Sequence, residues 1–313
     1  MTEILQNLFW ILIFPGFVFT VLVGLVASWI VRKVSALVQW RVGPPILQPL
    51  YDVVKLMGKE TLVPQQAQKV VFIAAPLVGF AGVLLLSTIL LRTALSSTAF
   101  VGDVIVAVYL LVLPSLALIF GSSASASPHA SVGTSREMKL VMGYELPLVL
   151  ALIVVIIKSG GQISLVAIAQ NTPAFSVSGM LAFLVSLLCI QAKLGFIPFD
   201  IAEAETELAG GILMEYSGAL LAIWKIMQTM MLVALPMFLV MVFMGGIGTS
   251  GAALAWGIGK YVLVLVLVIL IKNTNPRVRI DQAMKFFWVY CGLAMAIAVG
   301  LAIIGNSLGI NWL

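Results

Sequence analysis

Residues 218–244 read GALLAIWKIMQTMMLVALPMFLVMVFM, an apolar stretch that a single charge, Lys225, interrupts. A helix needs about 20 such residues to cross the hydrocarbon core of a bilayer. Backbone groups in lipid must be satisfied within their own segment, and the strands of a membrane barrel are shorter and alternate in polarity. A continuous apolar stretch of this length therefore predicts a transmembrane helix.

Similar stretches recur along the whole chain. We expect further spans at 8–31, 70–91, 103–121, 140–157, 179–197, 251–271 and 284–304. The composition agrees, since 62% of the residues are hydrophobic and only 9% are charged, against about 25% charged in soluble domains. The sequence predicts an all-α, polytopic membrane protein of about eight helices, with residues 1–313 forming a single transmembrane domain.

The basic residues predict how the chain crosses the membrane. Thirteen of the 17 lysines and arginines lie in or beside odd-numbered loops, whereas only Arg92 and Lys158 border even-numbered ones. Because cytoplasmic loops carry the excess of positive charge, we expect loops 32–69 and 198–217 to be cytoplasmic and both termini to be external. The net charge of +5 then reports topology, with the lipid bilayer as the first partner and no nucleic acid.

The first loop contains a second helical signal. After the Gly-Pro-Pro break at 43–45, apolar residues recur at helical spacing, namely Leu47, Leu50, Val53, Val54 and Met57. This pattern predicts an amphipathic helix at the membrane interface. Docking of a cytoplasmic partner is an alternative use of the same helix, and the two are compatible.

Acidic residues concentrate in the segment 195–218, GFIPFDIAEAETELAGGILMEYSG. It holds five of the twelve carboxylates: Asp200, Glu203, Glu205, Glu207 and Glu215. The spacing of Glu203 and Glu207 predicts that both lie on one helical face, with Glu205 on another. Repulsion between like charges on one face favours proton uptake from the cytoplasm, and a solvated acidic face is the alternative.

Four further charges lie in or beside the predicted spans. Glu145 is one turn into the span at 140–157, and Glu137 lies eight residues earlier, about two turns back on the same face. The two carboxylates are candidates for steps in a proton path, whereas an ion pair of Glu137 with a neighbouring cation is the alternative. Lys225 and Lys260 lie within spans, and because a lysine facing lipid is costly, both should face the bundle interior or snorkel to an interface.

Three strings resemble one known family. PFDIAEAETELAGGILMEYSG at 198–218 resembles the signature of PFD, then EAE, then EYSG in the fifth cytoplasmic loop of the H-type membrane subunit family of NADH:quinone oxidoreductase, respiratory complex I. RKVSALVQWRVGPPILQPLYDVVKLMGKE at 32–60 is similar to that family's first loop. SREMKLVMGYELP at 135–147 resembles the entry to its fourth span.

Within the family, the chain resembles the energy-converting hydrogenase branch more than the quinone-reducing branch. The quinone branch carries a glutamate before the Arg-Lys of the first loop and another in span six, where this chain has Val31 and Gln228. Lys225 and Lys260 fall where membrane subunits of the formate hydrogenlyase type also have lysines. The resemblance therefore implies a membrane-bound hydrogenase type of complex.

The resemblance implies a non-catalytic subunit, in the plasma membrane of a prokaryote, that anchors a soluble redox arm and couples electron transfer to proton or sodium translocation. The implied partners are hydrogenase-like large and small subunits, an iron-sulfur subunit and antiporter-like membrane subunits. A NiFe centre and iron-sulfur clusters would belong to those partners, with no cofactor or metal on this chain. Docking residues are Arg41, Asp52, Lys55, Arg136 and Asp200; residues of the ion pathway are Glu137, Glu145, Glu203, Glu205, Glu207, Glu215, Lys225 and Lys260.

Three alternatives stay open at this point. The chain resembles equally well the corresponding subunit of a sulfur-reducing relative, because the terminal chemistry would belong to partner subunits. A quinone-reducing relative is the second alternative, against which Gln228 counts. A stand-alone ion transporter is the third, and the inverted internal repeats that such carriers often show are not recognisable in the sequence.

Overall fold

The computed structural model describes residues 2–96, 102–170, 173–248, 250–310 and 312–313, with the side chains of residues 2–4, 205 and 206 excepted. Over these ranges the chain is helical or irregular and contains no strand. Seven helical segments are long and apolar enough to cross a membrane, and one further apolar helix has 17 residues. The prediction of an all-α polytopic membrane protein is confirmed.

The helices of the described chain are, in order, α1 (Thr2–Leu12), α2 (Phe17–Val38), α3 (Gln48–Met57), α4 (Lys69–Ser96), α5 (Asp103–Ser123), α6 (Pro128–Lys158), α7 (Leu165–Ala169), η1 (Pro173–Phe175), α8 (Val177–Lys193), α9 (Glu205–Leu208), η2 (Gly211–Leu213), α10 (Gly218–Phe243), α11 (Gly251–Thr274), α12 (Ile280–Lys285), η3 (Phe286–Cys291) and α13 (Gly292–Leu308). Of the three η segments, η3 is a single π-helical turn within the last span.

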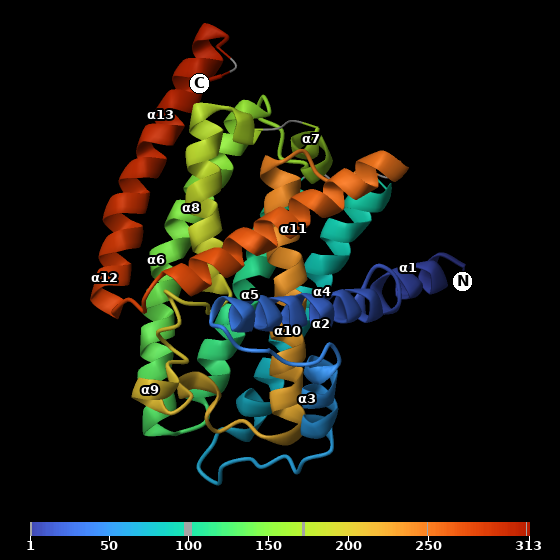
Figure 1. Ribbon diagram of the computed structural model, residues 1–313, viewed down its shortest axis with the longest axis vertical. Coiled ribbons are helices and arrows are strands. Elements are labelled where there is room, and N and C mark those ends of the chain that lie inside the picture. The colour runs from blue at the N-terminus through green and yellow to red at the C-terminus, as the bar shows by residue number, and fades with distance from the viewer. Residues whose placement is uncertain (1, 97–101, 171–172, 249, 311) are drawn as a thin grey trace.

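Helix α10 forms the centre of the bundle. It packs against α2, α3, α4 and α11, and every residue from 229 to 243 is buried. Figure 1 shows α4, α5, α6, α8, α10 and α13 running along the long axis, while α2 and α11 cross them obliquely. The apolar stretch that predicts a membrane span is thus the helix around which the other helices are arranged.

Several span boundaries differ from those predicted. The first span is interrupted between α1 and α2, where Pro15 lacks an N–H to continue the helix. Helix α2 then continues to Val38, so Arg32 and Lys33 belong to the helix and not to the loop. The stretch 122–139, which lies between two predicted spans, is largely helical, because Pro128 begins α6 at a position where proline is favourable.

The amphipathic helix predicted in the first loop is present as α3. Val53 is buried, while Leu50, Val54 and Met57 are exposed on the outer surface. Helix α3 packs against the first turns of α10 and against α2. In Figure 1 it lies beside the lower end of α10, at the same end of the bundle as α9.

The acidic segment between α8 and α10 is mostly irregular. Helix α9 has only four residues and begins after Glu203, so the prediction that Glu203 and Glu207 share a helical face is wrong. The cause is the burial of Ile201, Ala202 and Ala204, whose side chains pack into the bundle and hold the chain in an irregular path. The two glutamates consequently lie in different surroundings.

Candidate functional site

A cavity of about 540 Å³ lies where α2, α3 and α10 meet the irregular segment that follows α8. Ten ionisable residues line it, an unusual concentration in a chain this apolar: Arg32, Asp52, Lys55, Lys59, Glu137, Lys193, Asp200, Glu203, Lys225 and Lys272. Six of them are residues that the sequence singles out, namely Asp52, Lys55, Glu137, Asp200, Glu203 and Lys225. The fold thus brings together charges that are far apart in the sequence.

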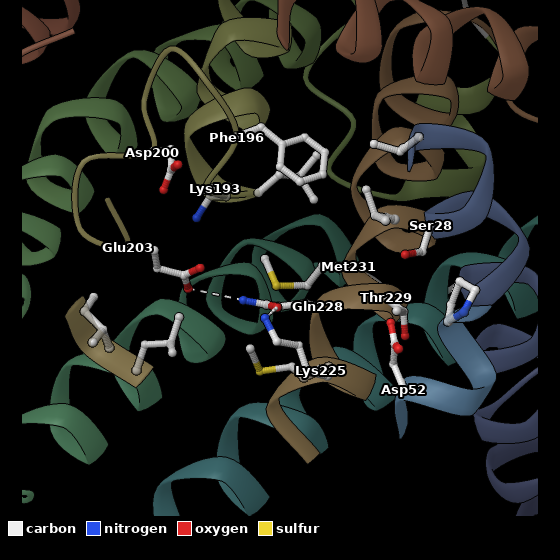
Figure 2. Close-up of a pocket in the computed structure, with 18 of the residues that line it drawn as sticks. Ser28, Asp52, Lys193, Phe196, Asp200, Glu203, Lys225, Gln228, Thr229 and Met231 are labelled. Atoms are coloured by element: carbon white, nitrogen blue, oxygen red, sulfur yellow. Dashed lines mark hydrogen bonds between the residues drawn. The ribbon is translucent and has the colours of Figure 1, made fainter. Parts of the chain in front are cut away.

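One wall of the cavity carries a chain of hydrogen bonds between side chains. The Lys225 ammonium donates to Gln228 Oε1 at 3.1 Å, and Gln228 Nε2 donates to Glu203 Oε1 at 3.2 Å. Figure 2 shows Gln228 between Glu203 and Lys225, with Lys193 and Asp200 on the adjoining wall. Lys225 and Gln228 are three residues apart on α10 and therefore lie on the same face.

An ion pair extends from the cavity into the bundle. Lys193, at the end of α8, pairs with Glu145 of α6, and its ammonium also donates to the Leu111 carbonyl at 3.2 Å. The Lys193 side chain is fully buried, and its ammonium lies 4.9 Å from the centre of the Tyr144 ring. Because a buried lysine needs a compensating charge, Glu145 and Lys193 form one unit.

Glu137 belongs to the same group of charges. It lines the cavity together with Glu203 and Lys193, and its charge interacts with those of both. Three charged groups therefore share the cavity, and the pairing of Lys193 with Glu145 extends this group into the interior of the bundle. Ionisable groups inside a membrane protein are typical of proton and ion pathways.

Ion pairs lie around the rim of the cavity. Arg32 donates to Asp52 at 2.7 Å, and Arg277 donates to Asp200 at 2.8 Å. Partial burial of Asp52 opposes ionisation, but hydrogen bonds from Arg32 and Gln48 and the nearby positive charges hold the pKa of Asp52 below its ordinary value. Asp52 is therefore a carboxylate at neutral pH.

The other predicted site residues lie outside the cavity lining. Arg136 donates to Glu207 at 2.6 Å on the exposed surface and joins α6 to α9. Arg41 is exposed beyond the end of α2, and Glu215 is half-buried before α10. The side chain of Glu205 lies outside the described residues.

Lys260 lies at the opposite end of α10. Its ammonium donates to the Met244 carbonyl at 2.6 Å and to the Gly246 carbonyl at 3.2 Å. At 1.5 Å per residue, Met244 is about 28 Å along the helix from Lys225. Lys260 thus satisfies carbonyls at the end of a helix and is remote from the other predicted residues of the ion pathway.

Sequence reasoning does not single out four of the ten ionisable residues that line the cavity, namely Arg32, Lys59, Lys193 and Lys272. It treats Lys193 only as a loop cation that reports topology, and it assigns Lys272 to a loop at the end of its span. The Lys272 ammonium lies 4.3 Å from the centre of the Phe196 ring on the cavity wall. The sequence does contain a signal for Lys193, which is its position within a mostly apolar stretch. Apolar residues both precede and follow it, and no clear polar loop begins at this point.

Within the described residues, no three His, Cys, Asp or Glu side chains are placed so that they could hold a metal ion. The two cysteines, Cys189 and Cys291, are both free and buried.

Comparison with known proteins decides the family. The family model described as NADH dehydrogenase matches residues 11–303. The chain belongs to this family. The H-type subunit of NADH-quinone oxidoreductase from Anoxybacillus flavithermus is 34% identical, covering 82% of this chain and 81% of that protein. The corresponding subunit from Thermomicrobium roseum is 33% identical over 87% and 89% of the two chains.

A solved structure also resembles this member of the NADH dehydrogenase family closely. A chain of the membrane-bound sulfane sulfur reductase, an archaeal respiratory membrane complex, superposes with a TM-score of 0.85 at 27% identity. The match covers 96% of this chain and 100% of that chain. The resemblance of the PFD, EAE and EYSG segment to the H-type membrane subunit of complex I is therefore confirmed, and the fold is that of a complex I-related membrane subunit.

Proposed function

We propose that this member of the NADH dehydrogenase family is the membrane-anchor and coupling subunit of a hydrogenase-type respiratory complex. It forms a single transmembrane domain that docks a soluble redox arm and links electron transfer to the translocation of protons or sodium ions. The observation that carries the proposal is the continuity of charge from the cavity to the buried Lys193–Glu145 pair. Burying charged groups costs free energy, so a subunit that served only as a structural anchor would gain no stability from them.

The coupling path begins in the cavity. Glu203 takes up a proton, and the change in its charge acts on that of Glu137, which lines the same cavity. The charge of Glu137 also interacts with that of Lys193, whose ammonium is held by Glu145 and by the Leu111 carbonyl. A change of charge in the cavity therefore changes the electrostatic energy of the ionised Lys193–Glu145 pair. The pair transmits this change toward the interior of the bundle.

Docking would use the surface at the same end of the bundle. Arg41 is exposed there, Asp52 lies on the cavity rim, and the Arg136–Glu207 pair joins α6 to the irregular segment. The expected partners are hydrogenase-like large and small subunits and an iron-sulfur subunit on the cytoplasmic side, with antiporter-like subunits in the membrane. The NiFe centre and iron-sulfur clusters would belong to the soluble partners.

Two related functions are supported by particular comparisons. The solved structure that matches over almost the whole chain belongs to a sulfane sulfur reductase, which supports a sulfur-reducing complex. The curated relatives are subunits of NADH-quinone oxidoreductase, which supports a quinone-reducing one. Purified complex supplied in turn with protons, polysulfide and a soluble quinone as electron acceptor separates the three, because each yields a different reduced product.

The coupling role is tested in sealed membrane vesicles that contain the assembled complex. Glu145→Gln and Glu203→Gln are expected to lower the number of ions translocated per electron pair at least tenfold, because both remove a charge of the path. Asp281→Asn is the matched control, since this acid lies on the exposed surface beside Arg279 and outside the cavity, and it should change the ratio less than twofold. Unchanged translocation in both path variants would contradict the proposal.

A further inference from the structure

Gln228 is the neutral member of the hydrogen-bonded chain on the cavity wall. Its amide oxygen accepts from Lys225, and its amide nitrogen donates to Glu203. A lysine ammonium can only donate and an ionised carboxylate can only accept, so these two partners fix which way the amide points. The amide thus connects a donor on the regular helix α10 to an acceptor on the irregular segment before α9.

The amide also sets the distance between the two charges. If Lys225 and Glu203 bonded directly, their charged atoms would be about 3 Å apart, as in ordinary charge-assisted pairs. Interposing the amide roughly doubles that separation and so roughly halves the Coulomb attraction. Glu203 is therefore held in place without being locked to the ammonium.

The position of Glu203 matters because of the charges around it. Its backbone belongs to an irregular segment, where side chains are positioned less firmly than on a helix. Glu203, Glu137 and Lys193 line the same cavity, and the charge of Glu137 interacts with those of the other two. A contact that anchors the Glu203 carboxylate to α10 consequently also limits how its distance from Glu137 can vary.

We propose that Gln228 is a positioning residue for ion translocation, whose side-chain amide joins Lys225 to Glu203 and holds the Glu203 carboxylate on the wall of the cavity that Glu137 also lines. This inference rests on the proposed function. Gln228 itself takes no proton, because a carboxamide does not titrate in the physiological range; it acts through Glu203.

Two near-isosteric substitutions separate this role from packing. Gln228→Met keeps the length of the side chain but makes neither hydrogen bond, and Gln228→Glu keeps the acceptor for Lys225 but places a second carboxylate against Glu203. Both are expected to lower ions translocated per electron pair at least fivefold in vesicles. Asn273→Leu is the matched control, because it removes an amide that joins α11 to Ser35 of α2 outside the cavity, and it should change the ratio less than twofold.

A double variant gives the sharpest test. Because Gln228 acts through Glu203, adding Gln228→Met to Glu203→Gln should lower translocation by less than a further twofold, since the carboxylate that Gln228 positions is already gone. A packing role predicts instead that the two defects combine, and a double variant at least fivefold worse than Glu203→Gln alone would overturn the inference.

The two proposals fail in different ways. If Glu203→Gln translocates normally, the proposed coupling path is wrong at its first step. If Glu203→Gln loses translocation while Gln228→Met and Gln228→Glu retain it, the path stands and only the role of Gln228 is wrong. Should Gln228→Met fail to assemble, Gln228→Glu decides, because it keeps both the size and the polarity of the residue.

Discussion

Lys225 and Lys260 are both lysines within long apolar helices, yet they lie in opposite kinds of surroundings. Lys225 donates to the side chain of Gln228 in a cavity lined by ten ionisable residues. Lys260 donates to two main-chain carbonyls just beyond the end of α10. A lysine in a membrane helix is thus not functional by virtue of its position alone, because its partners decide its role.

The same contrast holds for the two ends of the bundle. At the end that contains Lys260, the buried Asp103 accepts from the backbone N–H of Leu165 at 2.7 Å. At the cavity end, side chains bond to side chains, as in Glu203–Gln228 and Lys193–Glu145. Bonds to the backbone fix the fold, whereas networks of side chains can change their charge and rearrange.

Breaking the buried pair at the cavity end should have the largest effect on stability. Lys193→Met leaves Glu145 without its partner, and removing one member of a buried ion pair typically costs about 3 to 5 kcal/mol. The free energy of unfolding in detergent should fall by that order, and Lys193→Met with Glu145→Leu should recover most of it. A single variant as stable as wild type would contradict the pairing.

At the far end, Lys260→Met should destabilise the chain without stopping translocation. It leaves the Met244 and Gly246 carbonyls without this donor, and an unsatisfied buried group typically costs about 1 to 3 kcal/mol. Thermal unfolding of the purified complex measures the loss, with Lys260→Arg, which keeps a donor, as the control. If both variants are equally stable, Lys260 does not cap α10.

The start of α10 offers a third point of comparison, because one of its first backbone N–H groups is hydrogen-bonded to a side chain from a loop. The backbone N–H of Ala219 donates to Thr61 Oγ1 at 3.1 Å. Loss of such a contact at a helix N-terminus typically costs about 1 kcal/mol, so Thr61→Ala should lower the unfolding midpoint slightly. Thr61→Ser, which keeps the hydroxyl, should not, and the two variants are compared in the same detergent.

The smallest effect is expected at the cavity rim, where charges are partly exposed. The pKa of Asp52 is held below its ordinary value, so the Arg32–Asp52 pair stabilises the fold above about pH 4, and this contribution is lost as the pH falls through the lowered pKa. Exposed pairs are worth about 0.2 to 1 kcal/mol. Asp52→Asn should therefore reduce only slightly the amount by which the free energy of unfolding falls at acid pH. A larger reduction would indicate that the Arg32–Asp52 pair contributes as much as a buried ion pair.

The sequence predicts the spans well and their interruptions poorly. A bilayer requires about 20 apolar residues per helix, and this requirement is visible along the chain. The interruption at Pro15 and the early start of α6 at Pro128 depend on how single prolines are accommodated. The irregular path around Glu203 depends on which apolar neighbours become buried, and no local periodicity reports that.

The site is predictable in its residues more than in its contacts. Rare charges in an apolar chain identify Glu203 and Lys225, and the structure places both on one cavity wall. Lys193 escapes sequence reasoning because a lysine at a helix end is also what the positive-inside rule produces. Lys225 and Lys260 look alike in sequence, since only the tertiary fold determines whether a side chain or a carbonyl meets each ammonium.

One paired measurement tests directly whether ion coupling belongs to the cavity end. Lys225→Met and Lys260→Met are assembled into the complex, and ions translocated per electron pair are measured in the same vesicle preparation. If coupling belongs to the cavity end, Lys225→Met lowers this ratio at least fivefold while Lys260→Met keeps it within twofold of wild type. The reverse order, or equal losses in both variants, would contradict this assignment.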